Sequence, residues 1–128
     1  MKNDHIAFQV SDMEAAIAFY TNQLGLRLLS RTQDEAHEEI FAYLELQGGN
    51  LELLQKMNHI YQKPAISSAY CPHLALATDN LGQVHERLLA QGVPILNGPN
   101  EIAHQVKWLY VADPDNNVIE FVEWLSVS

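Results

Sequence analysis

The 128-residue chain lacks the hallmarks of several protein classes. Its single cysteine, Cys71, cannot form an internal disulfide, so nothing points to an oxidising compartment. Seven basic residues against sixteen acidic ones give a net charge of −9 at pH 7, so we expect no nucleic-acid or anionic-membrane partner. No apolar run approaches the ~20 residues that span a bilayer, and the first residues do not resemble a signal peptide. We therefore expect a soluble, acidic, cytoplasmic domain.

The chain does contain an internal repeat. Residues 5–24 and 73–92 each begin with His, continue as an alternating apolar segment, place Ser or Thr before Asp, and end in a helical pattern. The same shift of 68 residues places Glu52 on Glu120, so each copy separates its His from its Glu by 47 residues. Apolar periodicity alone does not fix a His and a Glu at one spacing. The pattern therefore indicates a tandem duplication.

Each copy predicts a strand, a helix and three further strands, so we expect an α+β fold built from two βαβββ modules. Large apolar residues alternate over residues 6–10 and recur at helical spacing over 13–24. The helix caps are expected at Ser11 or Asp12, and at Thr78 or Asp79. The further strands are expected at residues 26–32, 40–46, 50–55, 93–96, 106–111 and 118–123.

Half of such a chain is too small to bury a good core alone. We therefore predict a single domain over residues 1–128, made of a first module at 1–57, a linker at 58–71 and a second module at 72–128. Within the linker, His59 and Tyr61 are expected to lie in a solvated loop.

Strand alternation places His5, Glu52, His73 and Glu120 on the sheet faces opposite the helices. Their neighbours on those faces, Ala7, Ala75 and Ala77, are small and leave room for a ligand. Two imidazoles and two carboxylates make a mixed nitrogen and oxygen ligand set that suits one divalent metal: Ni, Zn, Co, Mn or Fe(II). A single His or Glu at a strand end is usually a solvated residue, but the matched spacing and shared face favour a functional set.

This ligand set suggests a reaction. A carboxylate that loosens from a metal can act as a general base while the metal stabilises charge on a substrate oxygen. The chemistry favoured is proton abstraction next to a carbonyl, passing through a metal-bound enediolate. Glu52 and Glu120 are the predicted catalytic residues.

The repeat, residues 18–26 (AFYTNQLGL) and residues 113–116 (DPDN) resemble the vicinal oxygen chelate superfamily of glyoxalases, bleomycin resistance proteins and extradiol dioxygenases. The four-ligand pattern is most similar to glyoxalase I, lactoylglutathione lyase. The resemblance implies concave mixed sheets around one divalent metal, with Ni or Zn favoured, and glutamates that shuttle a proton. It also implies a small-molecule substrate and a homodimer with active sites at the interface. The metal ligands implied are His5, Glu52, His73 and Glu120.

Two departures bear on the cosubstrate, which the resemblance implies to be glutathione or another thiol. Gln9 stands where glyoxalase I members place an Arg for a glutathione carboxylate, and residues 102–108 replace a Gly-Gly-Thr-Thr-like stretch, which counts against glutathione. The alternatives are an extradiol-type dioxygenase or a non-catalytic, antibiotic-binding member of the superfamily. A site within one chain and a site shared across a dimer both remain open.

Overall fold

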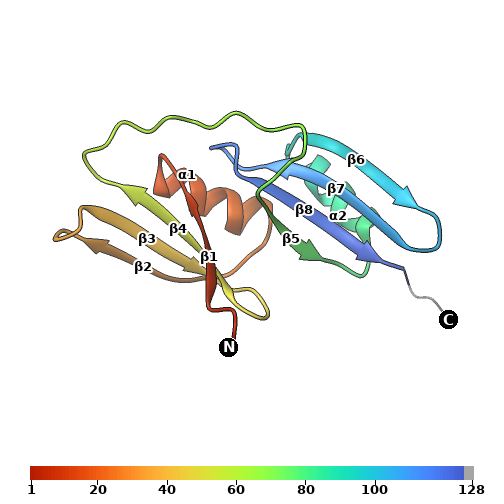
Figure 1. Cartoon of the computed structure of the whole chain (residues 1–128), viewed down its shortest axis with the longest axis horizontal. Helices are drawn as coiled ribbons and strands as arrows, with labels where there is room; N and C mark the ends of the chain where they lie inside the picture. Colours follow the sequence, from red (N-terminus) through yellow and green to blue (C-terminus); the bar gives the residue numbers. More distant parts are fainter. Residues whose placement is uncertain (126–128) are drawn as a thin grey trace. The chain divides into compact units, whose positions relative to one another are not determined.

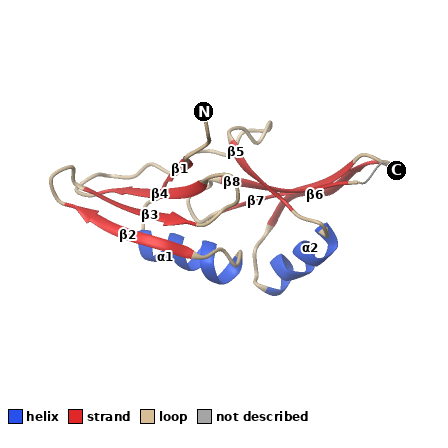
Figure 2. Ribbon diagram, turned by 90° about the horizontal axis from the view of Figure 1, so that it is seen from below, coloured by secondary structure: helices blue, strands red, loops and turns tan. Residues whose placement is uncertain are grey.

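A computed structural model describes residues 1–125 of the chain. The chain divides into two compact units, Met1–Pro64 and Ala65–Ser128. Each unit contains one four-stranded sheet and one α-helix on one face of that sheet (Figures 1 and 2). The prediction of an α+β fold made of tandem βαβββ modules is therefore confirmed, whereas the single-domain assignment stays a prediction. Within residues 1–125, no helix is long and apolar enough to cross a membrane.

The first unit follows the order strand, helix, three strands. Its elements are β1 (His5–Gln9), α1 (Met13–Ala18), the π-helical turn η1 (Phe19–Gln23), β2 (Leu28–Asp34), β3 (Glu39–Leu44) and β4 (Asn50–Lys56). The strands lie in the order β1-β4-β3-β2. Strand β1 pairs with β4 in parallel, and the other pairings are antiparallel. The first and last strands of the unit are thereby neighbours.

The second unit repeats this topology. Its elements are β5 (His73–Ala77), α2 (Leu81–Ala90), β6 (Ile95–Ile102), β7 (Val106–Ala112) and β8 (Val118–Trp124). The strand order is β5-β8-β7-β6, with β5 parallel to β8. Every pairing of the first unit thus has a counterpart in the second, as a duplicated sequence requires.

Burial on one face of each sheet fixes the direction of the functional side chains. On β4, Leu51 and Leu53 are fully buried, and on β8 Ile119 is as well. Because successive side chains on a strand point to opposite faces, Glu52 and Glu120 point away from these buried neighbours. A one-residue slip in register would bury the glutamates and expose the leucines, so the hydrophobic pattern itself holds the glutamates on the open face.

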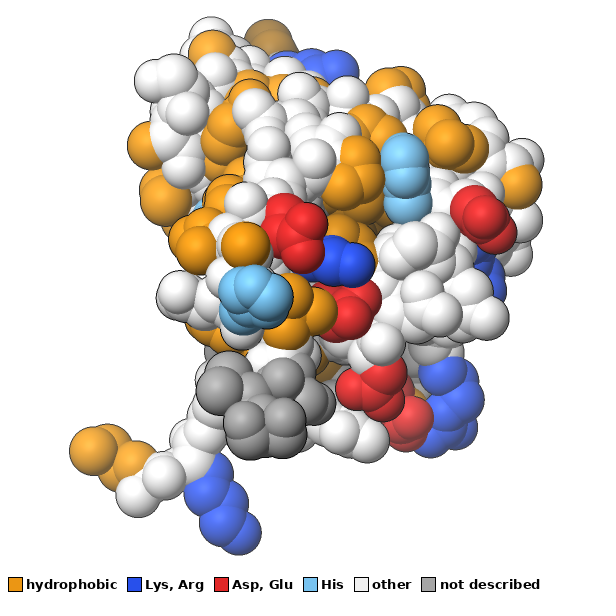
Figure 3. Space-filling view, turned by 90° about the vertical axis from the view of Figure 1, so that its right-hand side faces the viewer, with side chains coloured by type: hydrophobic (Ala, Val, Ile, Leu, Met, Phe, Trp, Pro, Cys, Tyr) orange, Lys and Arg blue, Asp and Glu red, His pale blue; other side chains and the backbone are white. Residues whose placement is uncertain are grey.

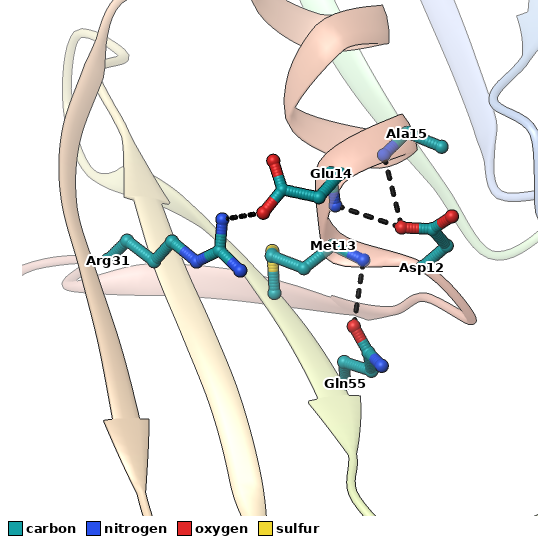
Figure 4. Close-up of polar contacts among 6 residues, drawn as sticks. All are labelled: Asp12, Met13, Glu14, Ala15, Arg31 and Gln55. Carbon is teal, nitrogen blue, oxygen red and sulfur yellow. Dashed lines mark hydrogen bonds and ion pairs between the residues drawn. The ribbon is translucent and has the colours of Figure 1, made fainter.

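Polar contacts at the start of α1 join the helix to the sheet (Figure 4). Asp12 is the N-cap, and its Oδ1 accepts hydrogen bonds from the backbone N–H groups of Glu14 at 3.0 Å and Ala15 at 3.3 Å. Gln55 Oε1, from β4, accepts a third from Met13 N at 2.7 Å. Three of the N–H groups that the first turn cannot pair within the helix are thereby satisfied.

The cap of α2 differs from the expectation of Thr78 or Asp79. Asn80 is the N-cap, and its side chain accepts a hydrogen bond from Gln83 N at 3.0 Å. Thr78 Oγ1 instead accepts a hydrogen bond from Asn80 N at 3.2 Å, which fixes the cap residue itself. The helix begins one residue later than an Asp79 cap would give, because an asparagine side chain caps as well as an aspartate.

Charged side chains lie at the surface, and on the side drawn in Figure 3 acidic side chains (red) lie next to basic ones (blue). Three cations of the first unit are held in ion pairs. These pairs are Arg27–Glu45 at 2.5 Å, Lys56–Glu39 at 3.9 Å, and Arg31–Glu14, which links β2 to α1 (Figure 4).

Candidate functional site

The first unit brings His5 and Glu52 together from neighbouring strands. Ala7, two residues after His5 on β1, is the register partner of Glu52 on β4. The two polar side chains therefore lie diagonally across the parallel pair, and His5 Nε2 is 3.5 Å from Glu52 Oε1. The side chains are 34% and 13% exposed, so the carboxylate is largely shielded while the imidazole remains accessible.

The second unit builds the same arrangement from His73 and Glu120. Ala75 on β5 is the register partner of Glu120 on β8. His73 Nε2 lies 3.0 Å from Glu120 Oε1, and the side chains are 21% and 16% exposed. In both units an alanine between the His and the level of the Glu keeps the space above the pair open.

A hydrogen bond at Nδ1 orients each imidazole. His5 Nδ1 lies 2.6 Å from Asp4 Oδ2, and His73 Nδ1 lies 2.8 Å from the backbone carbonyl oxygen of Tyr70. Both partners are acceptors, so Nδ1 donates and Nε2 is the nitrogen presented to the glutamate. The hydrogen bond to Asp4 also raises the pKa of His5 above its usual value; desolvation lowers it in part, and the charge of Glu52 raises it further.

Two tyrosines complete the pairs, and the sequence reasoning missed both. Tyr43 on β3 is the register partner of Glu52, and Tyr110 on β7 is that of Glu120. Each ring meets the imidazole of its unit edge-on, with ring centroids 5.5 Å apart at His5 and 5.4 Å apart at His73. The signal was in the sequence, because strand alternation places both tyrosines on the glutamate face.

The glutamates also affect these phenols. Burial is the main cause that raises the pKa of Tyr43 and of Tyr110 above the usual tyrosine value. At Tyr43 a hydrogen bond to Glu52 and its negative charge add to the rise, and at Tyr110 the charge of Glu120 does so. Both phenols therefore keep their protons at neutral pH and can donate hydrogen bonds to a carboxylate or to a substrate oxygen.

Tyr70 and Cys71 lie beside the second pair. The ring of Tyr70 stacks on that of Tyr110, with centroids 4.6 Å apart and planes 15° apart. Cys71 is exposed, and its Sγ lies 4.0 Å from His73 Nδ1. Tyr70 thus supports the pair twice, with its ring against Tyr110 and with its carbonyl at His73.

The DPDN turn sets the register of the second pair. The buried Asp113 accepts hydrogen bonds at Oδ1 from the backbone N–H groups of Asp115 and Asn117, both at 2.9 Å. Its Oδ2 accepts another from Asn117 Nδ2 at 2.9 Å. This closed turn joins β7 to β8 and holds the pairing that places Tyr110 opposite Glu120.

These geometries match a known family. Residues 2–121 match the Glyoxalase/Bleomycin resistance protein/Dioxygenase superfamily. The chain belongs to this superfamily. The resemblance inferred from the repeat and the His–Glu pairs is thereby confirmed.

Individual relatives within the superfamily carry different names. A lactoylglutathione lyase of Salmonella typhimurium is 28% identical over 128 residues, which cover 93% of this chain and 90% of the relative. The metallothiol transferase FosB of Lysinibacillus sphaericus is 30% identical over 120 residues, which cover 92% and 79%. The crystal structure of TnmS3, an antibiotic binding protein from a Streptomyces species, has the same fold, with a TM-score of 0.73 at 23% identity and coverage of 97% and 96%.

The donor atoms present in this superfamily member fit a divalent metal. Each unit supplies one imidazole nitrogen and one carboxylate oxygen on the open face of its sheet, and both imidazoles are oriented by a partner at the other nitrogen, as is usual for metal ligands. Within residues 1–125, neither unit gathers three or more His, Cys, Asp or Glu side chains at one point. The grouping of His5, Glu52, His73 and Glu120 around one ion therefore stays a prediction.

Each unit also has an open pocket away from its His–Glu pair. In the first unit, Gln9 and residues 59–62 line a pocket of about 310 Å³. His59 and Tyr61, expected in a solvated loop, thus contribute to a concave surface. In the second unit a pocket of about 280 Å³ lies between the start of α2 and strands β6 and β7, lined by Leu81, Gly82, Pro99, Asn100, Glu101 and Lys107.

Proposed function

We propose that this protein is a metal-dependent lyase or isomerase of the glyoxalase I type. Its substrate is a small α-carbonyl compound or the hemithioacetal that such a compound forms with a thiol. The observation that carries the proposal is the repeated pair, in which a His and a Glu on equivalent strands face each other at 3.5 Å in one unit and 3.0 Å in the other. The relatives named lactoylglutathione lyase, at 28% identity, support it.

In this proposal the glutamates move the proton. The carboxylate of Glu52 or Glu120 takes the proton from the carbon next to the carbonyl and returns it to the neighbouring carbon, so the product is an isomer of the substrate. Each carboxylate lies beside a phenol that keeps its proton, Tyr43 or Tyr110. These phenols hold the carboxylates in place and can donate a hydrogen bond to a substrate oxygen.

His5, Glu52, His73 and Glu120 would hold the divalent metal, with Ni or Zn favoured over Co, Mn and Fe(II). A bound divalent cation would stabilise the negative charge that develops on the substrate oxygen as the proton leaves. The two His and two Glu carry two negative charges between them, which balance the charge of the ion. Asp4 and the carbonyl of Tyr70 would keep each Nε2 directed at it.

Elemental analysis of the purified protein, paired with a hemithioacetal isomerisation assay before and after metal exchange, tests this function. We expect activity that disappears with chelation and returns with one preferred metal. The mass of the metal-loaded protein, measured by light scattering, tests the predicted homodimer. A protein that binds none of Ni, Zn, Co, Mn and Fe(II) would refute the function.

Other results of the same assays would assign other superfamily activities. Oxygen uptake with a catechol would indicate an extradiol-type dioxygenase. Stabilisation by a small molecule that a chelator does not change would indicate a binding protein without chemistry. Stoichiometric loss of free thiol would indicate thiol transfer, the activity in the name of the relative with 30% identity.

A further inference from the structure

The pocket of the first unit lies on the same sheet face as His5 and Glu52. Gln9 ends β1, and the side chains of His5, Ala7 and Gln9 alternate with those of Ile6 and Phe8, so the three share one face. The remaining lining residues, 59–62, follow β4 along the chain. Strand β4 runs parallel to β1, so its end lies beside Gln9 and brings the following segment to this face.

The spacing along the strand suits one small molecule. Glu52 is level with Ala7, and Gln9 lies two residues further, which is about 6.6 Å at about 3.3 Å per residue. Leu54 is the register partner of Gln9, and Phe41 is that of Leu54. An apolar strip therefore separates the His5–Glu52 pair from the polar pocket.

The chemistry of the pocket is polar without ionised groups of fixed sign. Its lining consists of two carboxamides, a phenol, an imidazole and one aliphatic side chain, with no Asp, Glu, Lys or Arg: Gln9, His59, Ile60, Tyr61 and Gln62. Arg27, Arg31 and Lys56 of this unit are held in ion pairs. Lys63 follows the pocket in sequence but is not among its lining residues.

We propose that this pocket is a specificity subsite that binds an uncharged, amide-bearing arm of the substrate. The inference rests on the proposed function, since it takes the His5–Glu52 end of the face as the reacting end. Carboxamides offer a donor and an acceptor each, so Gln9 and Gln62 complement an amide on the ligand. An anionic arm would lose hydration without meeting a cation in the lining. The preferred substrate is then a neutral conjugate rather than an acidic one.

Two probes that differ only at one end test the proposal. S-lactoyl-N-acetylcysteamine carries a neutral amide arm, and S-lactoyl-mercaptoacetate carries a carboxylate. We expect the full chain, measured by calorimetry, to bind the neutral probe about tenfold more tightly or better. Gln9→Ala should weaken binding of the neutral probe about three- to tenfold, the change that the loss of one hydrogen bond produces. Gln9→Arg should shift the preference toward the anionic probe.

The control separates the pocket from net charge. Gln33→Arg adds the same charge to the same unit on β2, outside the pocket, and should leave the preference unchanged. An equal shift in both Arg variants, or a neutral probe that perturbs no NMR resonance of residues 59–62 at millimolar concentration, would overturn the subsite. The mapping is repeated with chelator present, because the pocket contains no predicted metal ligand. Loss of metal binding would refute the proposed function alone, whereas intact metal binding without a Gln9 effect would refute the subsite alone.

Discussion

Glu123 Oε1 accepts a hydrogen bond from the backbone N–H of Leu81, the first residue of α2, at 2.7 Å. Gln55 and Met13 form the equivalent contact in the first unit, also at 2.7 Å. Each pair is the other shifted by 68 residues, as are the two His–Glu pairs. The last strand of each unit therefore has two roles, with a side chain that holds the helix on one face and a glutamate of the candidate site on the other.

Removal of this contact should destabilise the second unit. We expect Glu123→Ala to lower the free energy of unfolding by about 1–2 kcal/mol, because the N–H of Leu81 loses its acceptor at the helix start. Glu123→Gln keeps an acceptor oxygen and should cost less than about 0.5 kcal/mol. Urea unfolding followed by circular dichroism measures both variants. Equal losses in the two variants would show that the hydrogen bond is not the cause.

The turn at Asp113 should be more sensitive. Asp113→Ala removes the acceptor of two backbone N–H groups and one side-chain amide in a buried position, so we expect a loss of about 2 kcal/mol or more. Asp113→Asn keeps Oδ1 and should lose less. The same urea titrations check the order of these losses. A result in which Ala is tolerated as well as Asn would contradict the structural role assigned to the DPDN motif.

The contact between Asp4 and His5 has a consequence for pH. Because the Asp4 hydrogen bond raises the pKa of His5, the protonated imidazole persists to higher pH than in an unfolded chain. Its contribution to stability is present below the usual histidine pKa and is lost as pH rises through the folded value. Proton NMR titration of the metal-free protein should show this raised pKa, and Asp4→Asn should lower it. An unchanged His5 titration in the variant would contradict the assignment.

The glutamates should matter for the reaction far more than other carboxylates do. We expect Glu52→Gln and Glu120→Gln each to reduce kcat by about a hundredfold or more, because a carboxamide cannot accept the proton. Glu45→Gln, which removes an exposed ion pair in the first unit, and Glu123→Gln on β8 serve as matched controls and should keep nearly full activity. The hemithioacetal assay measures all four variants. Activity retained in both site variants would contradict a role for the glutamates in proton transfer.

The sequence was sufficient for the fold and for the composition of each pair. His5 and Glu52 repeat at His73 and Glu120 because the same topology is built twice, and hydrophobic alternation on β4 and β8 fixes the face on which the glutamates lie. These are short-range signals of period two, together with one long-range repeat. Their physical content survives in a single sequence, so both the modules and the pairs could be predicted.

Other features depend on contacts that a repeat search does not reveal. Tyr43 and Tyr110 are 67 rather than 68 residues apart, because the turns after β3 and β7 differ by one residue in register, so the matched shift passed over them. The length of β6 was also missed. Gly98 and Pro99 interrupt its apolar pattern, yet the strand continues through them to Ile102 with shifts in register. The pocket at Gln9 depends on where the chain after β4 lies, and only the structure shows that.

Metal binding by the purified chain tests the central claim most directly. Equilibrium dialysis against Ni and Zn, followed by elemental analysis, should give one tightly bound ion for each set of two His and two Glu. Glu52→Gln and Glu120→Gln should each weaken this binding by about tenfold or more, while Glu123→Gln should leave it unchanged. No bound metal in the wild-type protein, or equal binding by all four proteins, would contradict the account.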